Sequence, residues 1–328
     1  MLRPGGSENL LTVTFGAALG IDCRGRFTFS GQIDWAPKQT TLDPAPPAGP
    51  GASKRTFFGF GIWKSVYLVP VPSAAILHLV THTFYAGGHP TLIISDDSHA
   101  GFHVNVTLHA WAPRAVRGRV SVVGDWPGAS NIALTAAFSP GESSVTLQIP
   151  AAQTRGARLW HPHGHGEQPL YTITAAFTPD AGNHTISTVR RLGFRHVALV
   201  TINDSNSTVA TNAAQQDGTG QFGMFFRVNG AAVYARGANW IPSDLLDGRV
   251  TASAQRRQVQ SVAEGNMNTL RVWGGGIWET STFFDACDEL GILLYTDMQF
   301  TWQNINGSTD ERAEIIHQVP AHNNHIQR

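Results

Sequence analysis

The strongest constraint on the fold is a short apolar run that ends in charged, aromatic and glycine residues. Residues 266–279 read NMNTLRVWGGGIWE, so an apolar strand pattern leads through Arg271 and Trp273 into a glycine turn, and a helical pattern follows. Such a segment is typical of a β/α unit, whose strand ends carry functional side chains. From the spacing alone, the simpler interpretation is favoured, namely a buried strand before a turn.

The neighbouring residues repeat this alternation and reverse that preference. Strands are predicted at 235–240, 269–273 and 292–295. Helices are predicted at 251–264, with Val259 in the buried stripe, and from Ser281 to Gly291, and the capping sequence at Ser308 begins a third. Strands alternating with helices build a parallel sheet with right-handed crossovers.

Upstream of this region the pattern has a period of two. Val145, Leu147 and Ile149 alternate with polar residues, and residues 171–177 do the same, so each strand should bury one face. These runs are separated by turn residues and predict an antiparallel sandwich. Asn229-Gly230 lies between two apolar runs and predicts a hairpin with a type I′ turn.

Composition excludes several classes of function. The formal net charge is +0, which gives no indication of nucleic acid as a partner, and no apolar run is long enough to span a membrane. Two cysteines make no disulfide framework. His161, His163 and His165 alternate and could chelate a metal, but proline and glycine interrupt the segment. We therefore expect a connecting turn there, with no metal site and no cofactor.

Three motifs, in this order, resemble the barrel of glycoside hydrolase family two and, within it, the β-mannosidases. They are GANWIPSD at 237–244, NTLRVWGGGIWE at 268–279 and CDELGILLYTDM at 287–298. The resemblance implies a multidomain β and α/β fold. Residues 1–72 would form the C-terminal part of a jelly-roll sugar-binding-type domain, 73–197 an immunoglobulin-like β-sandwich, and 198–328 a linker hairpin with the first three β/α units of a (β/α)8 TIM barrel.

The resemblance also implies a sugar pocket. An Asp-Trp pair reaches from the sandwich into this pocket in the family, and the family's arginine and tryptophan of strand two lie beside the nucleophile and the innermost subsite. An ion pair and simple packing are the alternatives for Arg271 and Trp273. The predicted substrate-binding residues are Asp34, Trp35, Asn239, Trp240, Arg271, Trp273 and Asp297.

The catalytic pair is expected to be missing. Retaining hydrolysis needs two carboxyl groups about 5–5.5 Å apart. In the resembling family they are glutamates at the ends of strands four and seven, and neither motif occurs up to Arg328. We therefore expect no catalytic residue in this chain, which would be an internal fragment that lacks the remainder of its barrel and hydrolyses nothing alone.

The predicted function is that of a fragment of a retaining exo-β-mannosidase, acting on terminal β-D-mannose of oligosaccharides, glycoproteins or N-glycans. The alternatives are another family-two enzyme, such as an exo-β-glucosaminidase or endo-β-mannosidase, and a non-catalytic carbohydrate-binding protein. Five N-glycosylation acceptor sequences indicate lysosomal or secreted placement, although the chain has no signal peptide. They begin at Asn105, Asn183, Asn203, Asn206 and Asn306.

Overall fold

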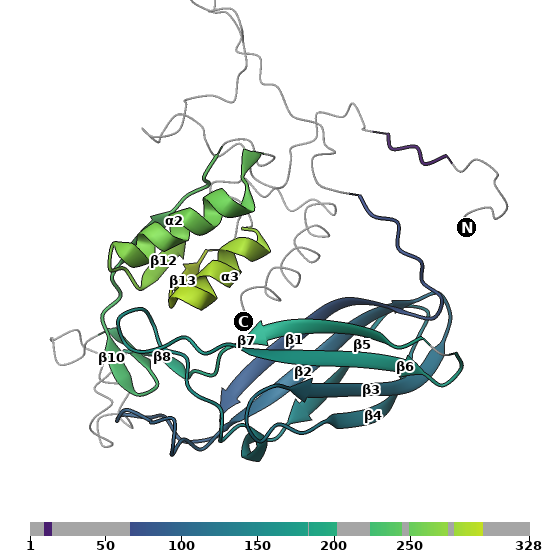
Figure 1. Ribbon diagram of the computed structural model, residues 1–328, viewed down its shortest axis with the longest axis horizontal. Helices are drawn as coiled ribbons and strands as arrows, with labels where there is room; N and C mark the ends of the chain where they lie inside the picture. Colours follow the sequence, from purple (N-terminus) through teal and green to yellow (C-terminus); the bar gives the residue numbers. More distant parts are fainter. Residues whose placement is uncertain are drawn as a thin grey trace, which may run out of the picture.

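Period-two alternation produces a two-layer antiparallel sandwich between Ala75 and Leu192 (Figure 1). The computed structural model describes residues 10–14, 66–182, 184–201, 224–244, 249–274 and 279–297. One layer has the strand order β1-β2-β5 and the other β4-β3-β6-β7. The strands are β1 (Ala75–Tyr85), β2 (Phe102–Ala112), β3 (Val116–Gly124), β4 (Ile132–Phe138), β5 (Gly141–Ile149), β6 (Tyr171–Pro179) and β7 (Ile186–Leu192).

The core of the sandwich lies where the inward faces of the two layers meet. Alternate residues of β2 are fully buried, and Leu147 and Ile149 of β5 join them as predicted. From the other layer, Phe177 packs edge-on against Phe138 with ring centroids 4.9 Å apart. Each strand thus buries one of its two faces, as the alternation of apolar and polar residues predicted.

The predicted hairpin is confirmed. It joins β9 (Phe225–Val228) to β10 (Ala231–Val233), and β8 (Val197–Val200) completes a three-stranded sheet. Asn229 and Gly230 have φ of 50° and 81°, as a type I′ turn requires. The side chain of Asn229 is also fully buried, and its Nδ2 donates to the backbone oxygen of Trp160 at 3.0 Å.

The predicted alternation of strands and helices is confirmed as a three-stranded parallel sheet with two helices. Its order is β11 (Gly237–Trp240), β12 (Thr269–Val272) and β13 (Leu293–Thr296), with α2 (Ala252–Glu264) between the first two and α3 (Ser281–Leu290) between the last two. Both helices lie on one side of the sheet (Figure 1). Their buried residues include Val259, Phe283 and Cys287.

The start of α2 and the end of α3 each have an identifiable cause. The hydroxyl of Thr251 accepts a hydrogen bond from the backbone nitrogen of Ala254 at 3.2 Å and caps α2. Gly291 ends α3 in the left-handed region at φ 77°. A Cβ atom there would lie 2.5 Å from the nitrogen of His163, so glycine also permits a close approach of the sandwich.

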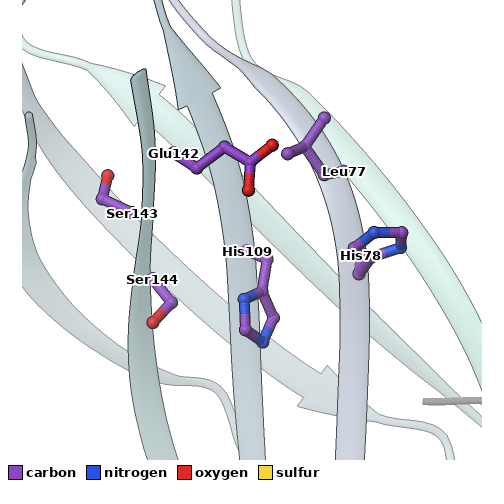
Figure 2. A pocket seen from close by; sticks show the side chains of 6 residues that line it. All are labelled: Leu77, His78, His109, Glu142, Ser143 and Ser144. Carbon is purple, nitrogen blue, oxygen red and sulfur yellow. The ribbon is translucent and has the colours of Figure 1, made fainter. Parts of the chain in front are cut away.

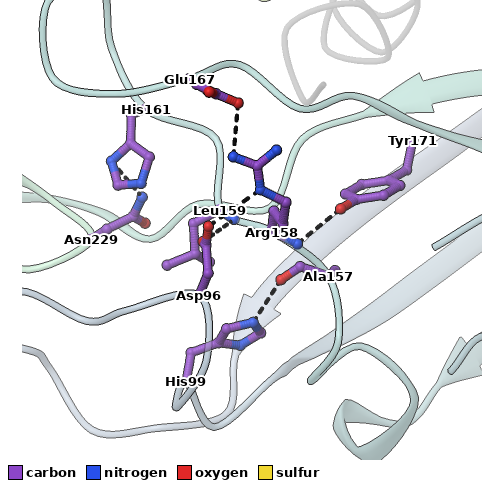
Figure 3. Close-up of polar contacts among 9 residues, drawn as sticks. All are labelled: Asp96, His99, Ala157, Arg158, Leu159, His161, Glu167, Tyr171 and Asn229. Carbon is purple, nitrogen blue, oxygen red and sulfur yellow. Dashed lines mark hydrogen bonds and ion pairs between the residues drawn. The ribbon is translucent and has the colours of Figure 1, made fainter. Parts of the chain in front are cut away.

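A connecting loop, residues 157–171, is held in place by polar contacts within the loop and with Asp96 (Figure 3). Arg158 pairs with Glu167 at 2.7 Å and with Asp96 at 3.5 Å. Asp96 also accepts from the nitrogen of Leu159 at 2.6 Å, and the hydroxyl of Tyr171 accepts from the nitrogen of Arg158 at 2.8 Å. The segment is therefore an ordered connecting turn, as expected from its proline and glycine residues.

The loop and β7 contact the C-terminal end of α3. The indole nitrogen of Trp160 donates to the backbone oxygen of Asp288 at 2.7 Å. Glu289 accepts from Arg191 of β7 at 2.7 Å and from Arg256 of α2 at 2.5 Å. One carboxylate thus joins the sandwich to both helices. Within the described ranges, no helix is long and apolar enough to cross a membrane.

We expect the contact between the sandwich and α3 to weaken in acid. Burial alone would raise the pKa of Glu289, but hydrogen bonds and charge from Arg191 and Arg256 outweigh it and hold that pKa below its ordinary value. A lowered pKa contributes stability above the unfolded-state value of about 4.3, and this stability is lost as the pH falls through the lower folded-state pKa. Asp285 also pairs with Arg191, at 3.5 Å.

Urea unfolding at pH 6 and at pH 3.5 measures this dependence. Glu289→Gln should be less stable than the natural chain at pH 6, and the difference should shrink at pH 3.5, which lies below the unfolded-state pKa of about 4.3. An unchanged difference between the two chains at both pH values would contradict the prediction.

Candidate functional site

Strand register decides which side chains can form a site on the parallel sheet. Asn239 lies beside Arg271, and Arg271 lies beside Tyr295. Trp240 and Val272, one residue later in their strands, are buried against the helices. Because successive strand residues point to opposite faces, Asn239 and Arg271 project from the face that the helices leave open.

Arg271 is the centre of a polar cluster on this face. Its Nη2 donates to Oδ2 of Asp297 at 2.5 Å, and its Nε donates to Oδ1 at 3.3 Å. Its Nη1 donates to Oδ1 of Asn239 at 3.1 Å. The backbone nitrogen of Gly274 adds a fourth contact, to Oδ2 of Asp297 at 3.2 Å. The cluster therefore joins the carboxyl ends of all three strands.

The geometry of this cluster suits orientation of a ligand. A guanidinium presents its donors in a planar fork, and two of them here fix the direction of one carboxylate. Asp297 is 19% exposed and Arg271 is 43% exposed, so the arginine keeps a solvent-facing edge. A hollow of about 320 Å³ lies beside them. Its lining residues are Ala235, Gly237, Ala238, Asn239, Thr269 and Arg271.

Trp240, which the sequence places in a sugar pocket, has a different environment. It is 8% exposed, and its ring packs against Phe283 with centroids 4.7 Å apart. Its indole nitrogen donates to Oε1 of Glu279 at 2.9 Å. Its substrate contact stays a prediction, but in the described structure Trp240 supports the strand end from the helix side.

Sequence reasoning missed the buried network around Glu279. Gln255 of α2 is fully buried and donates from Nε2 to Oε2 of Glu279 at 2.5 Å. The hydroxyl of Thr280 donates to Oε1 of the same glutamine. The signal was present, since Gln255 falls on the stripe of Val259 and Val262, where a polar residue needs a buried partner.

The remaining predicted residues are placed less fully. Trp273 is half-buried directly after β12, and its backbone nitrogen donates to the backbone oxygen of Trp240 at 3.1 Å. Asp34 and Trp35 lie outside the described residues, as does the helix predicted from Ser308. The structure thus brings Asn239, Arg271 and Asp297 together.

The histidine turn takes part in backbone packing. The nitrogen of His163 donates to the oxygen of Gly291 at 2.8 Å, and burial lowers the pKa of His161, whose ring lies 3.4 Å from the amide of Asn229. In the part of the chain that the structure describes, no three His, Cys, Asp or Glu side chains are grouped to hold a metal.

A second hollow, of about 250 Å³, lies on the outer face of the β1-β2-β5 sheet (Figure 2). His78 and His109 face each other across it with ring centroids 6.3 Å apart. Burial and His78 lower the pKa of His109, and Glu142 opposes them. The hollow shares no residue with the cluster around Arg271 or with the hollow beside it.

The described residues thus combine an antiparallel sandwich with a parallel α/β unit, and an arginine–aspartate pair lies at the ends of the parallel strands. No family model matches the chain. It is 37% identical over 185 residues to the β-mannosidase of Capra hircus, covering 55% of this chain and 19% of that protein. It is 29% identical over 272 residues to β-mannosidase B of Neosartorya fischeri, covering 79% of this chain and 28% of that protein.

Solved structures agree at the level of the fold. A β-D-mannosidase from Dictyoglomus thermophilum superposes with a TM-score of 0.64 at 24% identity, covering 90% of this chain and 32% of that chain. A β-glucuronidase from Bacteroides uniformis gives a TM-score of 0.56 at 14% identity, covering 78% of this chain and 28% of that chain. The chain is β-mannosidase-like, which confirms the resemblance seen in its motifs, and it spans about a fifth to a third of these relatives' length.

Proposed function

We propose that this chain supplies the substrate-orienting part of a retaining exo-β-mannosidase that removes terminal β-D-mannose from oligosaccharides or glycoproteins. The observation that carries the proposal is the convergence of Asn239, Arg271 and Asp297 at the carboxyl ends of three parallel strands. Catalytic groups of (β/α)8 barrels lie at that end. The β-mannosidase relatives favour this sugar over others.

The domain arrangement belongs to the same proposal. Residues 1–72 would complete a jelly-roll domain, 73–197 an immunoglobulin-like sandwich, and 198–328 a hairpin and the first units of a (β/α)8 barrel. The two-layer sandwich supports the second of these parts and the order of the parallel strands supports the third. Lysosomal or secreted placement is proposed from the glycosylation acceptor sequences.

Asp297 is proposed to orient the site, and not to act as the nucleophile. Two hydrogen bonds from Arg271 and one from Gly274 occupy its oxygens. Retaining hydrolysis needs a free nucleophilic carboxylate and a second carboxyl group about 5–5.5 Å away. We propose that Arg271, which Asp297 holds in one orientation, in turn orients a nucleophilic carboxylate supplied by another part of the enzyme. This chain alone is then inactive.

The test begins with the native transcript beyond both ends of the printed sequence. The product it encodes is assayed on aryl β-mannoside, aryl β-glucosaminide and aryl β-glucuronide. Preference for the mannoside supports the proposal, and preference for another sugar selects a related glycosidase. A message that encodes only this chain would reject the hydrolase, and calorimetric binding of mannose or mannobiose to the chain would then favour a carbohydrate-binding protein.

Arg271→Lys is expected to lower kcat/KM of that product by about 100-fold, because misplacing a positioned group by about 1 Å costs this much. Lysine keeps the charge but cannot hold Asp297 and Asn239 with one planar fork. Steady-state kinetics on the aryl β-mannoside measure the loss. Arg257→Lys, on the exposed side of α2, is the matched control and should leave kcat/KM unchanged. Equal kinetics for the two variants would contradict the role of Arg271.

A further inference from the structure

The outer face of the β1-β2-β5 sheet carries an acceptor sequence for N-linked sugar. Asn105-Val106-Thr107 lies in β2, the central strand of this sheet. Val106 is fully buried, so alternation places Asn105 and Thr107 on the outer face, the same face as His109. Of the five acceptor sequences in the chain, this one lies wholly within the described ranges.

The side chain of Asn105 is oriented so that a sugar can be attached to its Nδ2 atom. Gln148 of β5 donates from Nε2 to Oδ1 of Asn105 at 2.8 Å, in an exposed hydrogen bond. Among the described residues, the Nδ2 atom of Asn105 makes no hydrogen bond. Thr107 pairs with the hydroxyl of Thr146 at 2.8 Å on the same face. A sugar could therefore be attached to Nδ2 without breaking a hydrogen bond of the folded sheet.

Aromatic rings lie beside this amide. His82 of β1 is directly opposite Asn105, and its ring stacks on that of Phe84, with centroids 6.2 Å apart and planes 19° apart. Phe84 is 50% exposed. Diagonal neighbours across antiparallel strands are about 7–8 Å apart, within reach of a side chain that carries a sugar. The apolar C–H face of an N-acetylglucosamine can pack against an exposed ring.

We propose that Asn105 is an N-glycan acceptor and that its first N-acetylglucosamine lies over His82 and Phe84. The donor is an oligosaccharyl diphospholipid. A bond forms between Nδ2 and C1 of the sugar, the bond from C1 to the phosphate oxygen breaks, the lipid diphosphate leaves, and Nδ2 loses one proton. Because transfer occurs on the unfolded chain, the strand need only accommodate the product. For the natural protein this rests on the secretory placement proposed above.

The test directs the full chain through a glycosylating secretory host with a cleavable leader, so that it does not depend on the natural compartment. Enzymatic release of N-glycans converts a modified asparagine to aspartate, and peptide mass spectrometry locates that change. We expect the change at Asn105, its loss in Thr107→Val and its retention in Thr107→Ser. Thr146→Val is the matched control, because it breaks the same Thr107–Thr146 hydrogen bond but keeps the acceptor sequence.

An unmodified Asn105 in the secreted chain overturns the proposal, whether or not other acceptor sequences are occupied. Modification in Thr107→Val would overturn it as well. The ring contact is tested by thermal unfolding of chains trimmed to a single N-acetylglucosamine. Thr107→Val removes both the sugar and the Thr107–Thr146 hydrogen bond, whereas Thr146→Val removes only the hydrogen bond. The trimmed Thr146→Val chain should therefore have a higher Tm than Thr107→Val. Phe84→Ala, introduced into both chains, should abolish this difference in Tm. A difference that survives Phe84→Ala rejects the contact. Loss of mannosidase activity bears on none of these outcomes.

Discussion

Trp160→Ala is expected to lower the free energy of unfolding by about 3–5 kcal/mol, the usual cost of removing a buried tryptophan. Trp160 is 1% exposed and sits where three parts of the molecule meet. Its indole nitrogen donates to Asp288 of α3, and its backbone oxygen accepts from Asn229 of the hairpin. The guanidinium carbon of Arg195 lies 4.4 Å from the ring centroid.

Loss of the ring removes more than packing. Arg195 loses its cation–π contact with the indole ring, and the backbone oxygen of Asp288 loses its hydrogen-bond donor. The sandwich and α3 should then unfold in separate steps, because Trp160 links their folding. Urea unfolding followed by tryptophan fluorescence and by amide exchange in α3 measures both effects.

Two variants separate the causes. Trp160→Phe keeps a ring for Arg195 but has no indole nitrogen, so it should recover part of the loss. Trp111→Ala is the matched control, because Trp111 is 37% exposed on the outer face of the sandwich. A similar loss for Trp111→Ala and Trp160→Ala would show that Trp160 has no special part in joining the two regions.

Glu279→Ala is expected to lower the free energy of unfolding by about 2–6 kcal/mol, because two buried donors each lose a partner at about 1–3 kcal/mol. These donors are the indole nitrogen of Trp240 and the amide of Gln255. They belong to β11 and α2, while Glu279 lies just before α3. The carboxylate therefore holds together the framework directly behind Arg271.

The isosteric variant Glu279→Gln tests whether the charge of Glu279 or its hydrogen bonds contribute to the free energy of unfolding. Its oxygen can accept from Trp240, and its nitrogen can donate to Gln255 if that amide turns over. The double variant Gln255→Glu with Glu279→Gln exchanges the two groups and retains a donor for every acceptor in this network. We expect the double variant to recover most of the stability lost in Glu279→Ala.

Amide exchange in β11 and β12 reports this change locally, beside the global unfolding measurement. The control is Glu264→Ala, since Glu264 lies exposed at the end of α2 and accepts a hydrogen bond from Gln260 of the same helix. It should change the free energy of unfolding by no more than about 0.5 kcal/mol. If Glu279→Ala behaves in the same way, the buried network contributes little to the fold.

Local patterns predicted most of the elements. The helices of the α/β unit begin and end within a residue of their expected limits because Thr251 and Gly291 are explicit caps. The strand at 292–295 became β13, one residue later. The hairpin followed from Asn229-Gly230, whose backbone angles few other residue pairs adopt.

The candidate site was predicted in part. Arg271 and Asp297 were identified as strand-end residues, and alternation with their neighbours puts both on one side of the sheet. Trp240 adjoins Asn239 in sequence but points the other way, since successive strand residues alternate. Its partner Glu279 is 39 residues away, and no local pattern connects the two.

The sequence by itself determined the secondary structure, the caps and the residue types at the strand ends, because these depend on neighbours within a few positions of the chain. Only the tertiary structure decided which of those side chains meet. Arg271 reaches Asn239 across 32 residues, and Arg191 reaches Glu289 across 98. Such contacts depend on strand order and on how the sandwich docks on α3, which arise from packing of the whole molecule and leave no periodic trace in the sequence.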